Sequence, residues 1–166
     1  MSNALVVILM GSKADMEHSK KIADACNQFG IESVMRIASA HKTAEHALKI
    51  LRDYEADARS IVYITVAGRS NALSGFTDGT VSAPVIACPP PSEAFGGADV
   101  YSSLRMPSGI APAVVLEPIN AALFAAKIIG LVDESVREQV KVSQKRAADK
   151  IIEDDASVQY SVGSDR

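Results

Sequence analysis

The run Leu5-Val6-Val7-Ile8-Leu9-Met10-Gly11 decides the fold of this chain. It is an uninterrupted apolar run of strand length that ends at a glycine, which is typical of a parallel strand covered on both faces. The next residues, Ser12-Lys13-Ala14-Asp15, have the S-x-x-D form that begins a helix. The sequence therefore predicts a buried strand that turns at once into a helix, with Gly30 at the far end of that helix.

The same alternation of strand and helix continues along the chain. Further strands are predicted for residues 32–37, 60–67, 84–87 and 113–116. Helices are predicted for residues 43–54 and 120–131, with a short helix before Gly79. This alternation predicts an α/β domain of three layers with a five-stranded parallel sheet and right-handed crossovers. No repeat or linker interrupts residues 1–156, so they are expected to form a single domain.

The C-terminal part has a different character. Residues 133–155 are charged and helical in pattern, with a thin apolar stripe made of Val136, Val140, Ile151 and Ile152. Such a helix adds little to its own core, so it either packs across a neighbouring subunit or lies loosely on the surface. Residues 157–166 are polar and are predicted to be a flexible tail.

Composition narrows the class of protein. The chain has 166 residues, 48% of them hydrophobic, which fits one folded domain and argues against disorder. Its net charge of −3 leaves no basic surface for nucleic acid. The apolar runs are too short to span a bilayer, so no membrane partner is expected. Cys26 and Cys88 match no metal spacing, and without a signal-peptide pattern they are expected to be free thiols in the cytoplasm.

Polar loops follow the first three predicted strands. They are Gly11-Ser12, Ser39-Ala40-His41-Lys42 and Gly68-Arg69-Ser70-Asn71. Because parallel strands present their carboxyl ends at one edge of a sheet, these loops are expected to share a crevice. Each loop precedes a helix, whose free N–H groups and positive dipole end attract an anion. The sequence therefore predicts a cradle for a small phosphorylated molecule.

His41 is the candidate for general acid–base chemistry, because imidazole exchanges protons near neutral pH. Lys42 beside it is suited to holding an anion. His18 and His46 lie on predicted helix faces and are interpreted as surface residues. The histidines and cysteines form no metal-binding pattern, so no metal is expected.

Each loop also has a plainer structural interpretation. The Ser12-Lys13-Ala14-Asp15 run is also a helix cap, the His41-Lys42 pair a solvated turn, and Gly68 and Asn71 turn residues. Arg69 is stronger evidence for a binding site, since an arginine between two apolar segments needs a partner. Neither G-x-x-x-x-G-K-[ST] nor G-x-G-x-x-G follows the first strand, which disfavours ATP and dinucleotides.

Five runs, in order along the chain, follow the pattern of one known family. They are Gly11-Ser12 with Asp15, Ser39-Ala40-His41-Lys42, Ala67-Gly68-Arg69-Ser70-Asn71, Cys88-Pro89-Pro90 and Ser102-Ser103-Leu104-Arg105-Met106-Pro107-Ser108-Gly109. Together they resemble the PurE family, over residues 6–131. The resemblance implies a flavodoxin-like three-layer fold, here with an extra C-terminal helix.

Two positions favour the class II branch, the phosphoribosylaminoimidazole (AIR) carboxylases. Class I members, the N5-carboxyaminoimidazole ribonucleotide mutases, typically read S-A-H-R and G-A-G-G-A-A-H-L-P-G, whereas this chain has Lys42 and Gly68-Arg69-Ser70-Asn71. Class II implies a carboxy-lyase of purine (IMP) biosynthesis. It would convert AIR and CO2 reversibly to 4-carboxy-5-aminoimidazole ribonucleotide (CAIR) without ATP, biotin or a metal. The alternatives are the class I mutase and a non-catalytic nucleotide-binding module in which His41 is incidental.

The resemblance also implies residue roles. His41 would be the general acid and base, and Gly68, Ser70 and Asn71 would form a small dry pocket for the developing carboxylate. The other substrate-binding residues would be Gly11, Ser12, Asp15, Ser39, Lys42, Arg69, Ser103 and Met106.

Three further expectations concern the phosphate and the assembly. Ser12 and Lys42 would hold the ribose phosphate, and Asp15 the ribose hydroxyls. Ala14 replaces a serine that is usual in the family, which would remove one bond to the phosphate. The family is octameric, so the chain is expected to be a homo-octamer in which residues 103–109 complete a neighbour's site and the C-terminal helix finds a partner surface.

Overall fold

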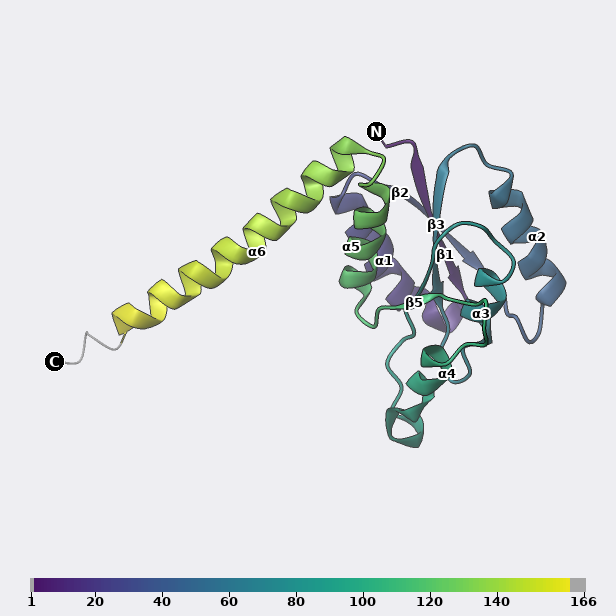
Figure 1. Cartoon of the computed structure of the whole chain (residues 1–166). Helices are drawn as coiled ribbons and strands as arrows, with labels where there is room; N and C mark the ends of the chain where they lie inside the picture. Colours follow the sequence, from purple (N-terminus) through teal and green to yellow (C-terminus); the bar gives the residue numbers. More distant parts are fainter. Residues whose placement is uncertain (1, 162–166) are drawn as a thin grey trace.

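The computed structural model describes residues 2–161 and contains a five-stranded, all-parallel sheet with helices on both faces (Figure 1). The strands are β1 Ala4–Met10, β2 Glu32–Ile37, β3 Ser60–Val66, β4 Val85–Ala87 and β5 Ala113–Val114, in the order β2-β1-β3-β4-β5. The α-helices are α1 Met16–Gln28, α2 Ala44–Glu55, α3 Ala72–Asp78, α4 Tyr101–Leu104, α5 Pro118–Ile129 and α6 Glu134–Ser161, and two 3-10 helices, η1 Lys13–Asp15 and η2 Ala94–Val100, complete the set. The predicted three-layer α/β fold is confirmed.

Strand β1 lies within the sheet and is buried along its whole length. It pairs with β2 on one side and β3 on the other, so that Leu5 lies beside both Glu32 and Ile61. Because successive side chains of a strand point to opposite faces, Val6 and Ile8 pack on the α1 and α5 side, whereas the alternate residues pack on the α2 side. The apolar run at the start of the chain thus forms the centre of both layers of the core.

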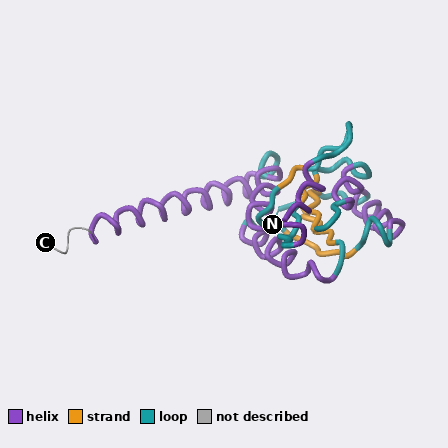
Figure 2. Tube along the Cα trace, turned by 90° about the horizontal axis from the view of Figure 1, so that it is seen from below, coloured by secondary structure: helices purple, strands orange, loops and turns teal. Residues whose placement is uncertain are grey.

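Small residues let the helices approach closely on one face of the sheet. Ala121, Ala122, Ala125 and Ala126 of α5 are all buried in the cluster that also contains Cys26 of α1. Helices lie on both sides of the strands when the molecule is seen from below (Figure 2). In the described part of the chain, no helix has the length and apolarity that crossing a membrane requires.

Helix α6 projects from the domain as a long single helix (Figures 1 and 2). Val136 and Val140, near its start, are buried against the domain, whereas Ile151 and Ile152 are about two-thirds exposed. The outer half of the helix therefore projects away from the sheet, while its first turns pack on the domain.

The helix is also longer than predicted and includes the first residues assigned to a tail. It continues from residue 155 to Ser161, with the Ser157 hydroxyl donating to the Asp154 carbonyl at 2.7 Å and the Gln159 amide to the Asp155 carboxylate at 3.0 Å. The prediction of a tail from residue 157 is wrong as far as Ser161, because neither proline nor glycine interrupts the helix before Gly163. Residues 162–166 lie outside the described part.

Candidate active site

A cleft of about 530 Å³ lies at the carboxyl edge of the sheet, where the loops after β1, β2 and β3 converge. The sequence predicted this convergence from the parallel strands alone. The structure brings nine of the predicted site residues together on its walls: Gly11, Ser12, Asp15, Ser39, His41, Lys42, Gly68, Arg69 and Ser70.

The loop after β1 is held by a reciprocal helix cap. The carboxylate of Asp15 accepts from the backbone N–H of Ser12 at 3.0 Å and from its hydroxyl at 3.2 Å. The Ser12 hydroxyl oxygen accepts from the N–H of Ala14 at 3.3 Å. Both the cap and the cleft-lining interpretations of these residues therefore hold, because the cap fixes side chains that also face the cleft.

The loop after β2 carries the candidate acid–base residue on a tight turn. The Ser39 carbonyl accepts from the Thr43 N–H at 2.9 Å, and the Ser39 hydroxyl accepts from the Lys42 N–H at 3.2 Å. The Ser39 N–H donates back to the Thr43 hydroxyl at 2.9 Å. These bonds fix the backbone on both sides of His41, whose side chain is exposed at the cleft.

The loop after β3 is tightly shaped. Arg69 has a φ of 56°, a left-handed conformation that is costly for a residue with a side chain. A Cβ on Gly68 would lie 3.4 Å from Cγ of Pro90, an ordinary contact distance, so this loop lies beside the segment after β4. The side chains of Arg69 and Ser70 are exposed at the cleft.

Three predicted substrate-binding residues do not line this cleft. Asn71 and Ser103 are each 2% exposed, and they are bonded to each other, with the Asn71 amide donating to the Ser103 hydroxyl at 2.8 Å. Met106 packs on α3, where a Cβ on Gly75 would lie 3.1 Å from its sulfur. Within one chain, therefore, these side chains lie behind the wall of the cleft because residues 102–106 pack against α3.

The loop after β4 also lines the cleft, although none of its residues was predicted for the site. Pro90, Pro91 and Ser92 contribute to its wall. The loop also follows a parallel strand, so the rule that predicted the other three loops applied to it. It was missed because β4 is short, with three residues, and because the proline run after it has no regular pattern. Small and apolar residues complete the cleft, namely Ala14, Ala40, Ala67 and Leu73.

His18 is not the surface residue that the sequence suggested. Its side chain is half-buried, and its Nε2 lies 3.4 Å from Sγ of Cys88. Burial lowers the pKa of His18, and the nearby Lys21 ammonium lowers it further. Burial also raises the pKa of the Cys88 thiol to about 12. Cys88 lies two residues before Pro90, the first proline of the cleft wall.

No cluster of three or more potential metal ligands occurs among the described residues. The cleft instead offers hydroxyl groups, backbone N–H groups and two cationic side chains, Lys42 and Arg69, which suits an anionic organic molecule. His41 adds the one imidazole on the cleft wall. This set of groups can bind a phosphorylated ligand and move a proton on it.

Comparisons with known proteins give the family. The AIR carboxylase family model matches residues 5–150. The chain is 60% identical to the phosphoribosylaminoimidazole carboxylase of Treponema denticola, covering 93% of this chain and 97% of that one. It is 58% identical to the protein of the same name from Archaeoglobus fulgidus, covering 90% and 82%. The crystal structure of Treponema denticola PurE superimposes with a TM-score of 0.92 over 93% of this chain and 98% of that one. The chain belongs to the AIR carboxylase family.

Proposed function

We propose that this protein joins AIR and CO2 to form CAIR, and that His41 is the general acid and base. The observation that carries the proposal is the cleft itself, in which an imidazole lies among anion-binding groups in a chain of the AIR carboxylase family. The relatives from Treponema denticola and Archaeoglobus fulgidus are both named as carboxylases of this substrate. The reaction belongs to purine biosynthesis, and the enzyme is a carboxy-lyase.

The chemistry requires one C–C bond and one proton transfer. AIR is an electron-rich aminoimidazole, so its ring carbon attacks the carbon of CO2 as an enamine does. The electron pair of one C=O bond moves to oxygen and gives a carboxylate, while the attacked ring carbon still carries its proton. His41 accepts that proton, and the released electrons restore the aromatic ring. In reverse, protonated His41 protonates the ring carbon, and CO2 leaves.

Other groups on the walls of the cleft stabilise the developing charge and bind the substrate. Donors of the loop after β3, from Gly68 to Ser70, stabilise the carboxylate as its charge develops. Ser12 and Lys42 hold the ribose phosphate, and Asp15 accepts from the ribose hydroxyls. We propose that no ATP, biotin or metal takes part, because the ring carbon is already nucleophilic and CO2 needs no activation.

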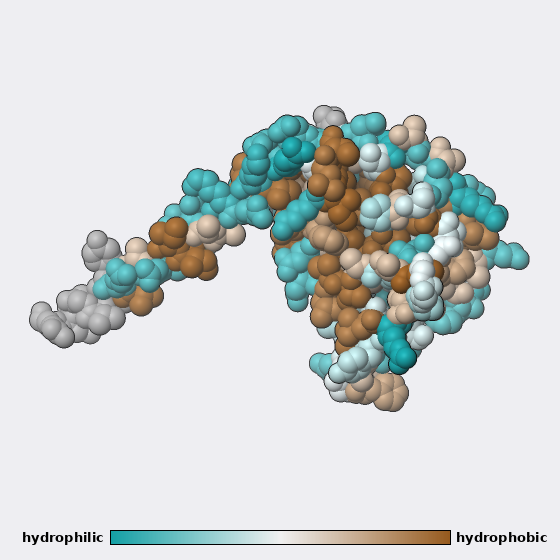
Figure 3. Space-filling model, in the orientation of Figure 1, coloured by the Kyte–Doolittle hydropathy of each residue, from teal (hydrophilic) through white to brown (hydrophobic). Residues whose placement is uncertain are grey.

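We also propose a homo-octamer in the cytoplasm. An assembly would cover exposed apolar side chains on and beside α5, where Figure 3 shows hydrophobic residues gathered, with more along α6. Exposed members of this set are Leu116, Ile119, Phe124, Leu131 and Val132. Sedimentation velocity at micromolar protein tests the octamer, and a monomer of about 17.5 kDa would contradict it.

The cytoplasmic location is supported by the two free thiols, Cys26 and Cys88, which suit a reducing compartment.

Absorbance tests the reaction directly. The purified protein is mixed with AIR and bicarbonate/CO2 in one cuvette and with freshly made N5-carboxyaminoimidazole ribonucleotide in another, with no ATP and with a chelator present. CAIR formed from AIR and CO2, with none from the N5 compound beyond its spontaneous breakdown, supports the carboxylase. Rapid conversion of the N5 compound with AIR and CO2 inert would make the protein a mutase. No conversion in either cuvette, with AIR still bound, would leave a non-catalytic binding module.

A further inference from the structure

Hydrogen bonds, together with the backbone of Asp99, connect two neighbouring loops of the cleft, the loops after β3 and β4. On one wall, the Ser92 hydroxyl donates to the Asp99 carboxylate at 2.8 Å. The Asp99 carbonyl accepts from the Ser102 hydroxyl at 2.8 Å, and that hydroxyl accepts from the Asn71 N–H at 2.9 Å. Asn71 directly follows Ser70, which lines the cleft in the loop after β3.

The direction of each bond is fixed by the chemistry of the groups. A backbone N–H can only donate, so the oxygen of Ser102 must accept from Asn71. A backbone carbonyl can only accept, so the one proton of the Ser102 hydroxyl goes to Asp99. Ser102 therefore uses its donor and one acceptor position at once. Neither alanine nor any apolar residue can replace it in this connection.

The side chain of Asn71 anchors the same point to the core. Its Oδ1 accepts from the Ser74 hydroxyl at 2.7 Å and from the Ser74 N–H at 3.2 Å, and its amide donates to Ser103. Ser74 Oγ lies 2.7 Å from the Thr65 hydroxyl in β3. All four side chains are at most 2% exposed, so water does not replace these bonds.

The loop that this network holds is under backbone strain. Arg69 keeps a φ of 56° two residues before Asn71, and such a conformation persists only where surrounding contacts enforce it. The hydrogen bonds of Asn71 fix the end of that loop that leads into α3. On the strand side, the loop continues directly from the buried residues of β3.

We propose that Asn71 and Ser102 are positioning residues, which hold the loop of residues 68–70 and the Ser92 wall in one geometry for the reaction. The proposal rests on the proposed function, because it assigns the carboxylate-stabilising donors to that loop. It also gives Asn71 a role other than substrate contact. The expected consequence is an effect on the chemical step larger than the effect on AIR binding, since the phosphate end is held by the separate loops after β1 and β2.

The decisive variant is Ser102→Ala, compared with Ser102→Thr, which keeps the hydroxyl. We expect Ser102→Ala to lower kcat roughly ten- to a hundredfold through misplacement of the loop, with KM for AIR within about twofold of the wild type. Ser102→Thr should restore most of kcat. The matched control is Thr80→Ala, which removes a hydroxyl bond of 2.7 Å to the Phe76 carbonyl at the other end of α3 and should keep the wild-type kcat.

Hydrogen–deuterium exchange of the free protein supplies a measurement that needs no activity. Amides of residues 66–73 should exchange faster in Ser102→Ala than in the wild type, and at the wild-type rate in Thr80→Ala. A wild type that does not carboxylate AIR would refute the proposed function, while the exchange result would still decide whether the network holds the loop. Unchanged exchange in Ser102→Ala, a kcat equal to that of the wild type, or no recovery in Ser102→Thr would each overturn the proposal.

Discussion

Nε2 of His18 lies 3.4 Å from Sγ of Cys88, although the two residues are 70 positions apart in the sequence. The contact joins α1 to the segment that leaves β4, and the Cys88 thiol also reaches the Leu116 carbonyl at 3.6 Å. Three parts of the chain therefore meet at one buried sulfur: helix α1, the residue after β4 and the segment after β5.

Both thiols should be unreactive in the folded protein. Burial raises the pKa of Cys26 and of Cys88 to about 12, and the thiolate is the form that reacts with alkylating agents. At pH 8, iodoacetamide should leave the native protein unmodified and should add twice to protein unfolded in guanidinium chloride. Mass spectrometry counts the adducts. Rapid labelling of Cys88 in the native protein would show that its sulfur is open to solvent.

The same thiols should make stability fall at alkaline pH. Their pKa rises from 9.0 in the unfolded chain to about 12 in the folded one, so the unfolded chain loses its protons first. The stabilising contribution is complete below pH 9 and is lost as the pH rises from 9 towards 12. Urea titrations at a series of pH values measure this loss. In Cys26→Ala the free energy of unfolding should fall less steeply across this range, and an equal slope would contradict the assignment.

Replacing His41 by asparagine should separate binding from catalysis. Asn keeps a polar side chain at the cleft but cannot accept and return a proton near neutral pH, so kcat should fall by roughly 10²–10⁴-fold. Calorimetric titration with AIR should give an unchanged Kd. His46→Asn is the matched control, because His46 is exposed on α2 and does not line the cleft. Full turnover in His41→Asn would remove His41 from the mechanism.

Ala14→Ser should improve the binding of AIR. Ala14 lines the cleft beside Ser12, so a serine there would add a hydroxyl within the predicted phosphate site. A hydrogen bond to a charged group contributes about 1.5–3 kcal/mol, which corresponds to a decrease in KM of at least tenfold. Ala58→Ser, in an exposed position away from the cleft, serves as the control. An unchanged KM in Ala14→Ser would place the phosphate elsewhere in the cleft.

Asp133 should stabilise the start of α6 in a pH-dependent way. The Ser135 hydroxyl, first, and the N–H of Val136 lower the pKa of Asp133 from 3.8 to about 2. This contribution is complete above pH 3.8 and is lost as the pH falls from 3.8 towards 2. Asp133→Ala should have a lower Tm than the wild type at pH 7. Between pH 3.8 and 2 it should lose less stability than the wild type does.

Asp149→Ala is the control for Asp133, because Asp149 lies within α6 and forms an exposed ion pair with Lys145 instead of capping the helix. Thermal melts followed by circular dichroism at pH 7, 4 and 2.5 make the comparison. If the two alanine variants show the same pH dependence, the cap does not account for the acid sensitivity.

Features that depend on local pattern could be predicted from the sequence. The apolar run at residues 5–10 identified the central strand. The rule that parallel strands end at one edge of the sheet correctly predicted that His41, Gly68 and Ser12 lie together. Both inferences need only the period of the strand and the polarity of the loop that follows.

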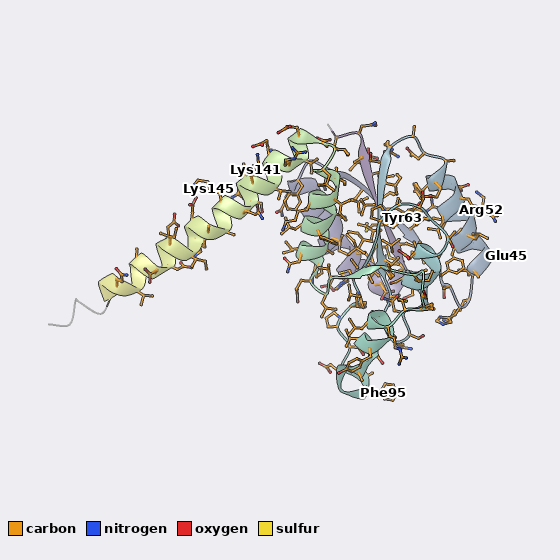
Figure 4. All side chains as sticks on the ribbon, viewed as in Figure 1. Glu45, Arg52, Tyr63, Phe95, Lys141 and Lys145 are labelled. Atoms are coloured by element: carbon orange, nitrogen blue, oxygen red, sulfur yellow. The ribbon has the colours of Figure 1, made fainter. Side chains whose placement is uncertain are left out.

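Features that depend on packing between distant segments could not be predicted. Asn71 and Ser103 have the polar side chains of a binding site, yet they bond to each other across 32 positions and are buried. His18 looked like a surface residue because its partner, Cys88, lies on another element. The exposed Phe95 at the tip of the loop before α4 is a further case, since its left-handed φ of 50° and those of the two following glycines place the ring outward (Figure 4).

Helix α6 has one more consequence. Its 28 residues, at about 1.5 Å each, make a rod about 42 Å long, which is several times the radius of gyration of about 14 Å expected for the domain beside it. Lys141 and Lys145 lie along this rod, away from the sheet (Figure 4). Whatever contacts its outer end is held at a set spacing from the cleft. Removing whole turns of the helix, each about 5.4 Å long, would shorten that spacing and leave every catalytic group in place.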